Sequence, residues 1–268
     1  MLRRAMDILK ESALAFQNLI NIQYNIILGK NKKLSYVTIS FSKAEFHHLI
    51  GLQYLTDLPY LKADRTRILN EIIYDKITYE DLKKIAHFPE IEGRILLFKH
   101  LEECLDSDNL VFKYHANSTN HSLVQAEYLL KNQYARNDIY IFIDKHPSPG
   151  MFFCRSFFKK TKMDYTANMP NMAVLYKEKS DLENNRSIIF VDKLSSQYSK
   201  DQDKTVGLFG FYRSIEDAAK SEEQPKTSDK LIRAVKYELI VEESLSATVE
   251  IDGDIEVDNE VNKSKKKR

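Results

Sequence analysis

The order of hydrophobic patterns is the feature that most constrains the fold of this 268-residue chain. In its N-terminal part, apolar side chains recur at three- and four-residue spacing, which predicts helices. In its middle part, short alternating runs rich in β-branched and aromatic residues predict strands. Helices first and strands later are typical of the α+β class. We therefore expect a helical N-terminal half packed on a twisted antiparallel sheet.

The expected elements follow from these patterns. A long amphipathic helix over 4–28, ended by Gly29, is predicted by the spacing of Met6, Leu9, Ala13, Phe16, Ile20, Tyr24 and Ile27. The alternation over 33–41 predicts a first strand. The remaining predicted helices are 43–55, 62–76, 79–86, 89–106 and 123–131, and the remaining predicted strands are 110–115, 138–144, 151–158, 172–179 and 187–191.

Composition divides the chain into three parts: an N-terminal helix at 1–32, a central α+β domain at 33–194, and a charged tail at 195–268. The tail holds 13 Lys or Arg and 16 Asp or Glu, a net charge of −3, while the rest holds 27 and 23, a net charge of +4. Segregated charge with few aromatics predicts a largely disordered tail. Two apolar segments, Val206–Tyr212 and Leu231–Val241, are the places where short ordered elements are expected.

We predict that the tail beyond about Leu194 is dispensable for folding, because apolar periodicity is lost there. Limited proteolysis should leave a stable fragment ending near that residue. Protection of the tail as strong as that of the central domain would instead place Val206–Tyr212 and Leu231–Val241 in the core.

Cysteine usage and hydropathy point to a reducing compartment. The two cysteines, Cys104 and Cys154, exclude a disulfide framework and a four-cysteine zinc site. No apolar run approaches the roughly 18 residues of a membrane helix. Arg3 and Arg4 are not followed by the apolar core and small-residue cleavage site of a secretory signal. We therefore expect a cytoplasmic protein without a membrane partner.

Two adjacent histidines stand out because histidine alone has an unperturbed pKa between pH 5 and 8. His47 and His48 lie on the helix that follows the first predicted strand, and Ser42 with Glu45 predicts a capping box at its start. Neighbours on a helix point about 100° apart, so we expect only one of the two to share a site with a given partner. The alternative is a surface histidine beside a half-buried one, without chemistry.

The run Phe-x-His-Leu-x-Gly over 46–51 resembles the N-terminal motif of a phage-associated nuclease family. That family is named for its likeness to barnase, EndoU, colicin and RelE nucleases, and this chain is similar to its type 4 group. Three later segments agree in order and spacing: 155–158 (RSFF), 164–166 (DYT) and the strand at 172–177 (MAVLYK). The similarity extends from about residue 37 to about residue 179.

The resemblance implies metal-independent cleavage of RNA, by attack of the 2′-hydroxyl on the adjacent phosphorus. It also implies a phage or mobile-element protein that acts as a toxin or effector, with RNA as its main partner. Whether a protein inhibitor or other protein partner exists is left open. No cofactor or metal is expected, since the chain has no HxxxH motif and no Walker-type glycine loop.

The candidate catalytic residues are His48, Arg155, Ser156, Lys177 and Tyr165. His48, the matched histidine of the motif, would be the general base or acid. Arg155 has a planar fork suited to a phosphate, Ser156 could hydrogen-bond a phosphate oxygen, and Lys177 would lie on the next strand. Tyr165 or Tyr176 could donate a proton or stack on a base. The competing interpretations are a surface ion pair for Arg155, an ordinary strand-end residue for Ser156, and packing for the tyrosines.

Two other functions stay open from the sequence. One is a non-catalytic interaction protein on the same scaffold, which the weakly basic body favours. The other is a nucleic-acid-binding regulator that uses the basic terminus at 263–268. Arg94 and Lys99, on the predicted helix 89–106, lie next to Glu92 and Glu102 and are therefore interpreted as part of a solvated face.

Overall fold

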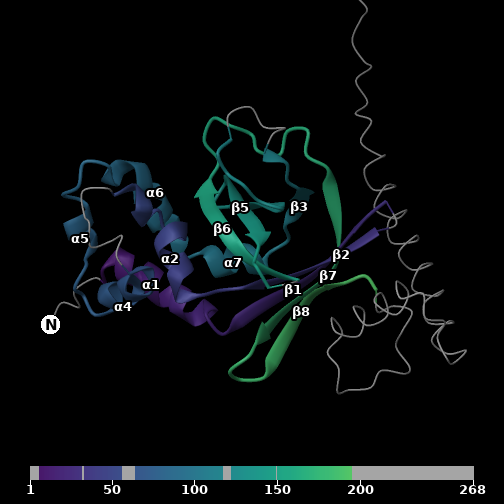
Figure 1. The fold of residues 1–268 in the computed structure, drawn as a ribbon, viewed down its shortest axis with the longest axis horizontal. Coiled ribbons are helices and arrows are strands. Elements are labelled where there is room, and N and C mark those ends of the chain that lie inside the picture. The colour runs from purple at the N-terminus through teal and green to yellow at the C-terminus, as the bar shows by residue number, and fades with distance from the viewer. Residues whose placement is uncertain (1–5, 32, 56–63, 117–121, 149, 195–268) are drawn as a thin grey trace, which may run out of the picture.

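Seven strands close on one another into a barrel, and an eighth extends it on one side (Figure 1). The computed structural model describes residues 6–31, 33–55, 64–116, 122–148 and 150–194. The strands are β1 (Ile22–Lys30), β2 (Lys33–Ser40), β3 (Leu110–Lys113), β4 (Tyr128–Tyr134), β5 (Asn137–Lys145), β6 (Met151–Lys159), β7 (Asn171–Asp181) and β8 (Arg186–Asp192). Their hydrogen-bonded order is β1-β2-β6-β5-β4-β3-β7-β8, and an additional pairing of β7 with β1 closes the ring.

Closure of the ring corrects the predicted fold class, because the sheet is not an open antiparallel one with a helical half packed on it. Strand β1 is hydrogen-bonded along both edges: Tyr24 lies opposite Ile39 of β2 and opposite Lys179 of β7. Strand β2 pairs with β6 in parallel, with Ser40 opposite Phe153, whereas the other strand pairs are antiparallel. Alternation along a strand predicts its two faces but not which edges meet, and for that reason the prediction is wrong.

The long N-terminal helix predicted over 4–28 is also wrong. The helix α1 (Ile8–Leu19) ends before Asn21, and the chain continues as β1. Tyr24 and Ile27 continue the three- and four-residue spacing of the apolar residues in α1. Aromatic and β-branched residues also suit a strand, and here both residues lie on β1, which has partners on both edges. Pairing with two strands therefore overrides the helical period.

A second correction concerns the short helix predicted over 123–131, where the structure has the start of β4. Strand β4 joins β5 through Ala135 and Arg136, and both have positive φ angles, 45° and 64°. Two-residue turns with positive φ at both positions match the twist of a hairpin, but they usually carry Asn or Gly. The hairpin was missed because its turn lacks those residues.

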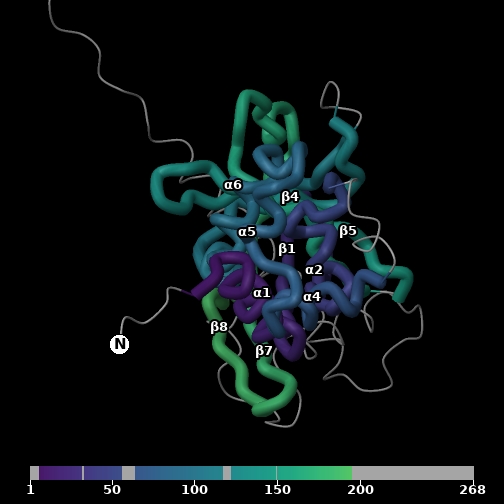
Figure 2. The backbone as a smooth tube through the Cα atoms, turned by 90° about the vertical axis from the view of Figure 1, so that its left-hand side faces the viewer, coloured from purple at the N-terminus to yellow at the C-terminus, as the bar shows by residue number. Residues whose placement is uncertain are grey.

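The helices gather at one side of the strands, as the two views show (Figures 1 and 2). They are α1, α2 (Lys43–Leu49), the short 3-10 helix η1 (Leu52–Tyr54), α4 (Arg65–Ile73), α5 (Tyr79–Leu82), α6 (Phe88–Phe98) and α7 (Leu101–Asp106). The predicted helix 43–55 stops at Leu49, and the predicted helix 89–106 is divided at Lys99 and His100. The predicted strands at 33–41, 110–115, 138–144, 151–158, 172–179 and 187–191 are confirmed to within a few residues.

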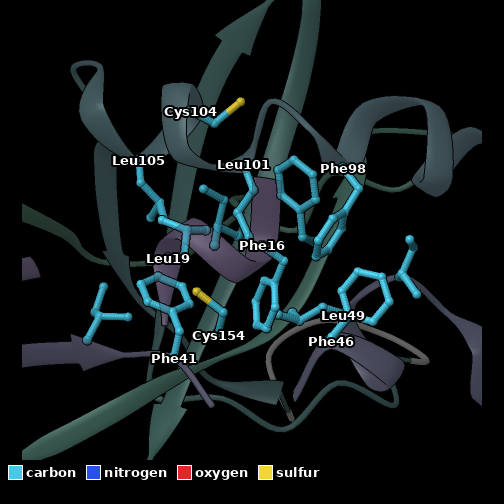
Figure 3. Close-up of a cluster of buried hydrophobic side chains, with 14 of the residues drawn as sticks. Phe16, Leu19, Phe41, Phe46, Leu49, Phe98, Leu101, Cys104, Leu105 and Cys154 are labelled. Atoms are coloured by element: carbon cyan, nitrogen blue, oxygen red, sulfur yellow. The ribbon is translucent and has the colours of Figure 1, made fainter. Parts of the chain in front are cut away.

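An aromatic cluster joins the helices to the barrel (Figure 3). The rings of Phe16 of α1, Phe46 of α2 and Phe98 of α6 lie 5.5–5.8 Å apart, and Phe98 contacts Phe157 of β6 at 6.0 Å. All four side chains are essentially buried. Edge-to-face and tilted contacts of this kind add to the free energy of apolar burial. The cluster fixes α2 and α6 against β6.

The described residues end at Leu194, which is buried. The tail at 195–268, with its candidate segments Val206–Tyr212 and Leu231–Val241, lies outside the described residues. Among the helices that the structure describes, none combines the length and apolar character needed to cross a membrane.

Candidate functional site

The helix α2 separates the two adjacent histidines, as their angle on a helix requires. His47 is 2% exposed, whereas His48 is an exposed residue of the last turn. Phe46 and Leu49 are fully buried and anchor the helix, so His48 faces outward from the core. Ser42 is the N-cap as predicted, but its hydroxyl donates to Glu45 Oε1 at 2.9 Å and accepts no backbone N–H, so the predicted capping box is incomplete. The exposed histidine is thus the one that matches the nuclease motif.

Parallel pairing of β2 with β6 brings His48 towards Arg155. Ser40, the last residue of β2, lies opposite Phe153 of β6, and the two strands run in the same direction. Beyond these partners one chain continues into α2 and the other reaches Arg155. Residues more than a hundred positions apart in the sequence therefore meet at one end of the strands.

The positive charges of three arginines act on His48. Partial desolvation lowers the pKa of the His48 imidazole first, and the positive charges of Arg155, Arg65 and Arg94 lower it further. Each of these effects disfavours the protonated ring. Arg155 comes from β6, Arg65 from the first turn of α4, and Arg94 from α6. Arg155 is therefore near enough to His48 for its charge to act on the imidazole, and a shared site for the two residues stays a prediction.

A β-bulge sets the direction of Arg155. Phe142 lies opposite Ser156 and Ile143 lies opposite Cys154, so Arg155 is the additional residue on β6. Cys154 and Phe157 both belong to the main core, which means that the alternation of faces shifts by one residue between them. Arg155 and Ser156 consequently fall on the same face, away from that core. Bulges of this kind re-aim side chains and are common beside active sites.

The surroundings of Arg155 leave it available to an anion. Its side chain is 41% exposed, and the carboxylate oxygen Asp144 Oδ2 is 3.9 Å from its Nε. That distance is at the limit of an ion pair, and exposed pairs are worth at most about 1 kcal/mol. The guanidinium also lies 5.8 Å from the centre of the Phe153 ring. Ser156, by contrast, is buried.

Gly51 explains the last position of the motif and the placement of Arg94. It has a φ of +93°, which ends α2, and a Cβ there would lie 3.0 Å from Ile91 Cγ2 and 3.3 Å from Arg94 Cδ. A side chain at position 51 would thus collide with α6. The absence of one lets α6 approach closely and brings the stem of Arg94 beside the end of the His48 helix.

Arg94 lies between two aromatic rings. Its guanidinium carbon is 5.1 Å from the centre of Phe158 and 5.4 Å from the centre of Tyr54. Burial lowers the pKa of this guanidinium, and its hydrogen bond to Tyr54 opposes that shift. Arginine keeps its charge under such conditions, so the rings hold a fixed cation beside His48.

Tyr165 belongs to the same neighbourhood through the Asp-Tyr-Thr segment. Asp164 accepts hydrogen bonds from the backbone and hydroxyl of Thr166, at 2.9 and 2.6 Å, and from Lys160 at 2.8 Å, which hold its pKa well below the ordinary range. The turn packs the Tyr165 ring 5.6 Å from Phe158. Burial raises the pKa of Tyr165, and the charge of Arg94 lowers it. Tyr165 is therefore a neutral hydroxyl near Arg94.

The structure does not bring Lys177 to this site. Its Nζ donates to the Ser107 carbonyl at 2.6 Å and lies 5.3 Å from the centre of Phe190. On β7, Lys177 is opposite Ile26 of β1, and β1 and β2 separate it from β6. Three strand spacings amount to roughly 14 Å. The strand was predicted, but the barrel inserts two others between it and the arginine strand.

Sequence reasoning missed Arg94, Arg65 and Tyr54. Arg94 was assigned to a solvated face because Glu92 lies beside it, yet Glu92 instead accepts a hydrogen bond from Tyr79 at 2.6 Å. The available signal was that Arg94 follows Ile91 by three residues, at the edge of the apolar stripe of α6. No pattern in the sequence relates Arg65 or Tyr54 to His48.

The arrangement joins a histidine that is neutral at pH 7 to three permanent cations. Such a set can accept a proton and bind an anion at the same place. Within the described residues, no group of three or more His, Cys, Asp or Glu is arranged to hold a metal ion.

Replacing Gly51 by Ala tests the placement of Arg94. We expect a loss of about 1–3 kcal/mol in the free energy of unfolding, because Ala is strained at positive φ and its methyl group collides with Ile91. In the folded protein, the His48 pKa measured by NMR titration should rise towards 6.5 as Arg94 moves away.

Gly93 provides the matched control, since a Cβ there would meet nothing within 4 Å. Gly93→Ala should stabilise α6 by about 0.5–1 kcal/mol and leave the His48 titration unchanged. Equal effects of the two substitutions would contradict the role given to Gly51.

Lys177 should give stability a distinct pH dependence. Burial lowers the pKa of its ammonium to about 8, and the side chain is 4% exposed. An unfolded lysine titrates near 10.4, so between about pH 8 and 10.4 only the unfolded chain holds this proton. Stability therefore rises with pH across that window, by at most about 3 kcal/mol.

Urea unfolding of the wild type and of Lys177→Met, at pH 7 and pH 10, measures this effect. The difference in unfolding free energy should move in favour of the wild type at pH 10, because the loss of the Ser107 hydrogen bond is common to both conditions. If the difference in unfolding free energy between the wild type and Lys177→Met is the same at pH 7 and pH 10, the amine of Lys177 is solvated in the folded protein.

Comparison with known proteins identifies the family. No curated protein and no solved structure matches the chain. A family model described as phage-Barnase-EndoU-ColicinE5/D-RelE like nuclease4 matches residues 8–194, which span α1 to the end of the described barrel and include His48, Arg94, Arg155 and Tyr165. With more than half of its length matched, this chain belongs to that family of phage-associated nucleases related to the barnase, EndoU, colicin and RelE types.

Proposed function

We propose that this protein is a metal-independent endoribonuclease that cleaves RNA through attack of a 2′-hydroxyl on the adjacent phosphorus. The observation that carries the proposal is a single neutral histidine, His48, among Arg155, Arg94 and Arg65. The nuclease family supports it, because a nuclease needs a phosphate-binding site. The surrounding arginines supply that binding without a metal.

In this mechanism His48 takes the proton of the 2′-hydroxyl. The 2′-oxygen then forms a bond to phosphorus, and the bond from phosphorus to the 5′-oxygen breaks, which leaves a cyclic phosphate and a 5′-hydroxyl. Arg155 and Arg94 hold the phosphate and stabilise the charge that develops on its oxygens. Tyr165, whose pKa is raised, stays protonated and is the candidate proton donor to the leaving oxygen.

Of the other two predicted residues, Ser156 takes a lesser part and Lys177 takes none. Ser156 is beside Arg155 on the bulge, where its hydroxyl is the candidate hydrogen-bond donor to a phosphate oxygen. Lys177 has no part, because its amine is held at Ser107. As a phage-associated enzyme, the protein would act as a toxin or effector on the RNA of a host or competitor.

Incubation of the purified protein with labelled RNA in EDTA tests the reaction. We expect fragments that end in a cyclic phosphate, and no cleavage of the same sequence with 2′-deoxyriboses. His48→Ala should reduce the rate about 10²–10⁴-fold, the usual loss of a general base. The exposed His87, which pairs with Glu90, serves as control, and His87→Ala should keep full activity.

His47→Ala separates chemistry from packing. Because His47 is buried, its loss should lower the melting temperature while the folded fraction keeps its rate. Equal, small rate losses in His47→Ala and His48→Ala would remove α2 from the mechanism. If the labelled RNA remains uncleaved in EDTA, the protein is better explained as a non-catalytic interaction protein.

The pH profile gives a further prediction. A base with a lowered pKa is already neutral below pH 6.5, so kcat/KM should rise with pH through a midpoint below 6.5 and level off near neutrality. Arg155→Gln removes one of the cations that lower this pKa. The variant should therefore have both a lower rate and a midpoint shifted upward, and an unshifted midpoint would argue against contact between the two residues.

A further inference from the structure

Tyr54 is an exposed aromatic residue at the edge of the candidate site. It ends η1, and its side chain is 46% exposed. Three aromatic residues of the described chain are exposed, Tyr54, Tyr74 and Phe190, and of these Tyr54 lies against an arginine, Arg94. Apolar surface left in contact with water is unfavourable, so an aromatic ring exposed beside a candidate site suggests a ligand contact.

The backbone fixes Tyr54 relative to His48. The amide of Gly51 donates to the His48 carbonyl at 3.2 Å, and the amide of Tyr54 donates to the Gly51 carbonyl at 3.0 Å. Two successive turns therefore connect the proposed base to the ring. Since Gly51, at a positive φ that glycine adopts readily, joins them, the distance between His48 and Tyr54 is set by local structure and is largely independent of the rest of the barrel.

Arg94 fixes the orientation of the ring. Its guanidinium lies 5.4 Å from the centre of Tyr54 and is itself held against Phe158 at 5.1 Å. One side of the Tyr54 ring is thereby engaged with a cation that also lies near His48. Because Tyr54 is 46% exposed, part of its ring stays open to solvent beside this contact. A flat apolar surface thus adjoins the arginine that would bind a phosphate.

We propose that Tyr54 is a stacking platform for a nucleobase next to the scissile phosphate, and that the enzyme therefore acts on single-stranded RNA. This inference rests on the proposed ribonuclease function. Every base has a π-face, so stacking on an aromatic side chain tolerates many sequences. In a duplex the bases are stacked on each other and paired, and proteins reach their faces only in single strands, loops and bulges.

Binding of an oligonucleotide that cannot be cleaved separates this proposal from catalysis. The probes are a fluorescent tetranucleotide of thymidines and a tetramer of the same charge with abasic residues, both with 2′-deoxyriboses. We expect Tyr54→Ala to raise the Kd for the thymidine probe about 5- to 150-fold, the range for loss of one stacked base. The Kd for the abasic probe should rise much less, because Phe158 still holds Arg94 in place.

Two further variants make the result specific. Tyr54→Phe keeps the ring and should bind the thymidine probe within about threefold of the wild type. Tyr74→Ala removes another exposed tyrosine, 73% exposed, at the opposite end of α4 from Arg65, and should bind as the wild type. A preference of the wild type for thymidine over abasic probe, lost only in Tyr54→Ala, supports the platform.

Cleavage assays distinguish failure of this inference from failure of the proposed function. If wild-type protein cleaves RNA but Tyr54→Ala binds both probes as the wild type does, the ribonuclease stands and the platform is wrong. If the wild type cleaves a hairpin stem as fast as its loop, restriction to single strands is overturned. If the wild type cleaves nothing yet Tyr54→Ala loses base-dependent binding, the site binds single strands without catalysis.

Discussion

Hydrogen bonding of β1 along both edges is the interaction on which the rest of this structure depends. One edge joins β7 and closes the ring, and the other joins β2 and places it beside β6. Because β2 and β6 run in parallel, the helix that follows β2 begins where β6 approaches Arg155. An antiparallel partner would have sent that helix to the other end of the strand. Closure and the assembly of the site therefore have one cause.

The candidate site concentrates positive charge that is only weakly paired. Lys160 and Lys179, elsewhere in the described chain, each have a carboxylate oxygen at 2.8 Å, whereas the Asp144 carboxylate is 3.9 Å from Arg155. Desolvation and then the positive charges of Arg155, Arg65 and Arg94 lower the pKa of His48, and an anion bound there would offset those charges. The aromatic rings around Arg94 and the bulge at Arg155 hold these charges in place before any ligand arrives. Such preorganisation is what makes charge effective in catalysis.

Prediction from sequence succeeded where a short segment determines its own conformation. Six of the eight strands, the start of α2 at Ser42 and the separation of His47 from His48 follow from local patterns and from the angle between helical neighbours. It failed where a partner distant in sequence decides. Tyr24 and Ile27 fit a helix until β2 and β7 pair with them, and the parallel contact of Ser40 with Phe153 has no local signature. Lys177 was grouped with Arg155 because its strand, β7, follows β6 in the sequence. In the barrel, β1 and β2 lie between these two strands.

The pairing of the first strand with the seventh also has a consequence for synthesis on the ribosome. Strand β1 and the histidine helix emerge early, but β6, with Arg155, and β7 are translated more than a hundred residues later. A nascent chain that has been translated only as far as α2 therefore lacks Arg155, and its ring of strands is not closed. Activity of any kind at this site must wait until translation has passed β7. The topology thereby makes assembly of the candidate site depend on the synthesis of the strand that closes the ring.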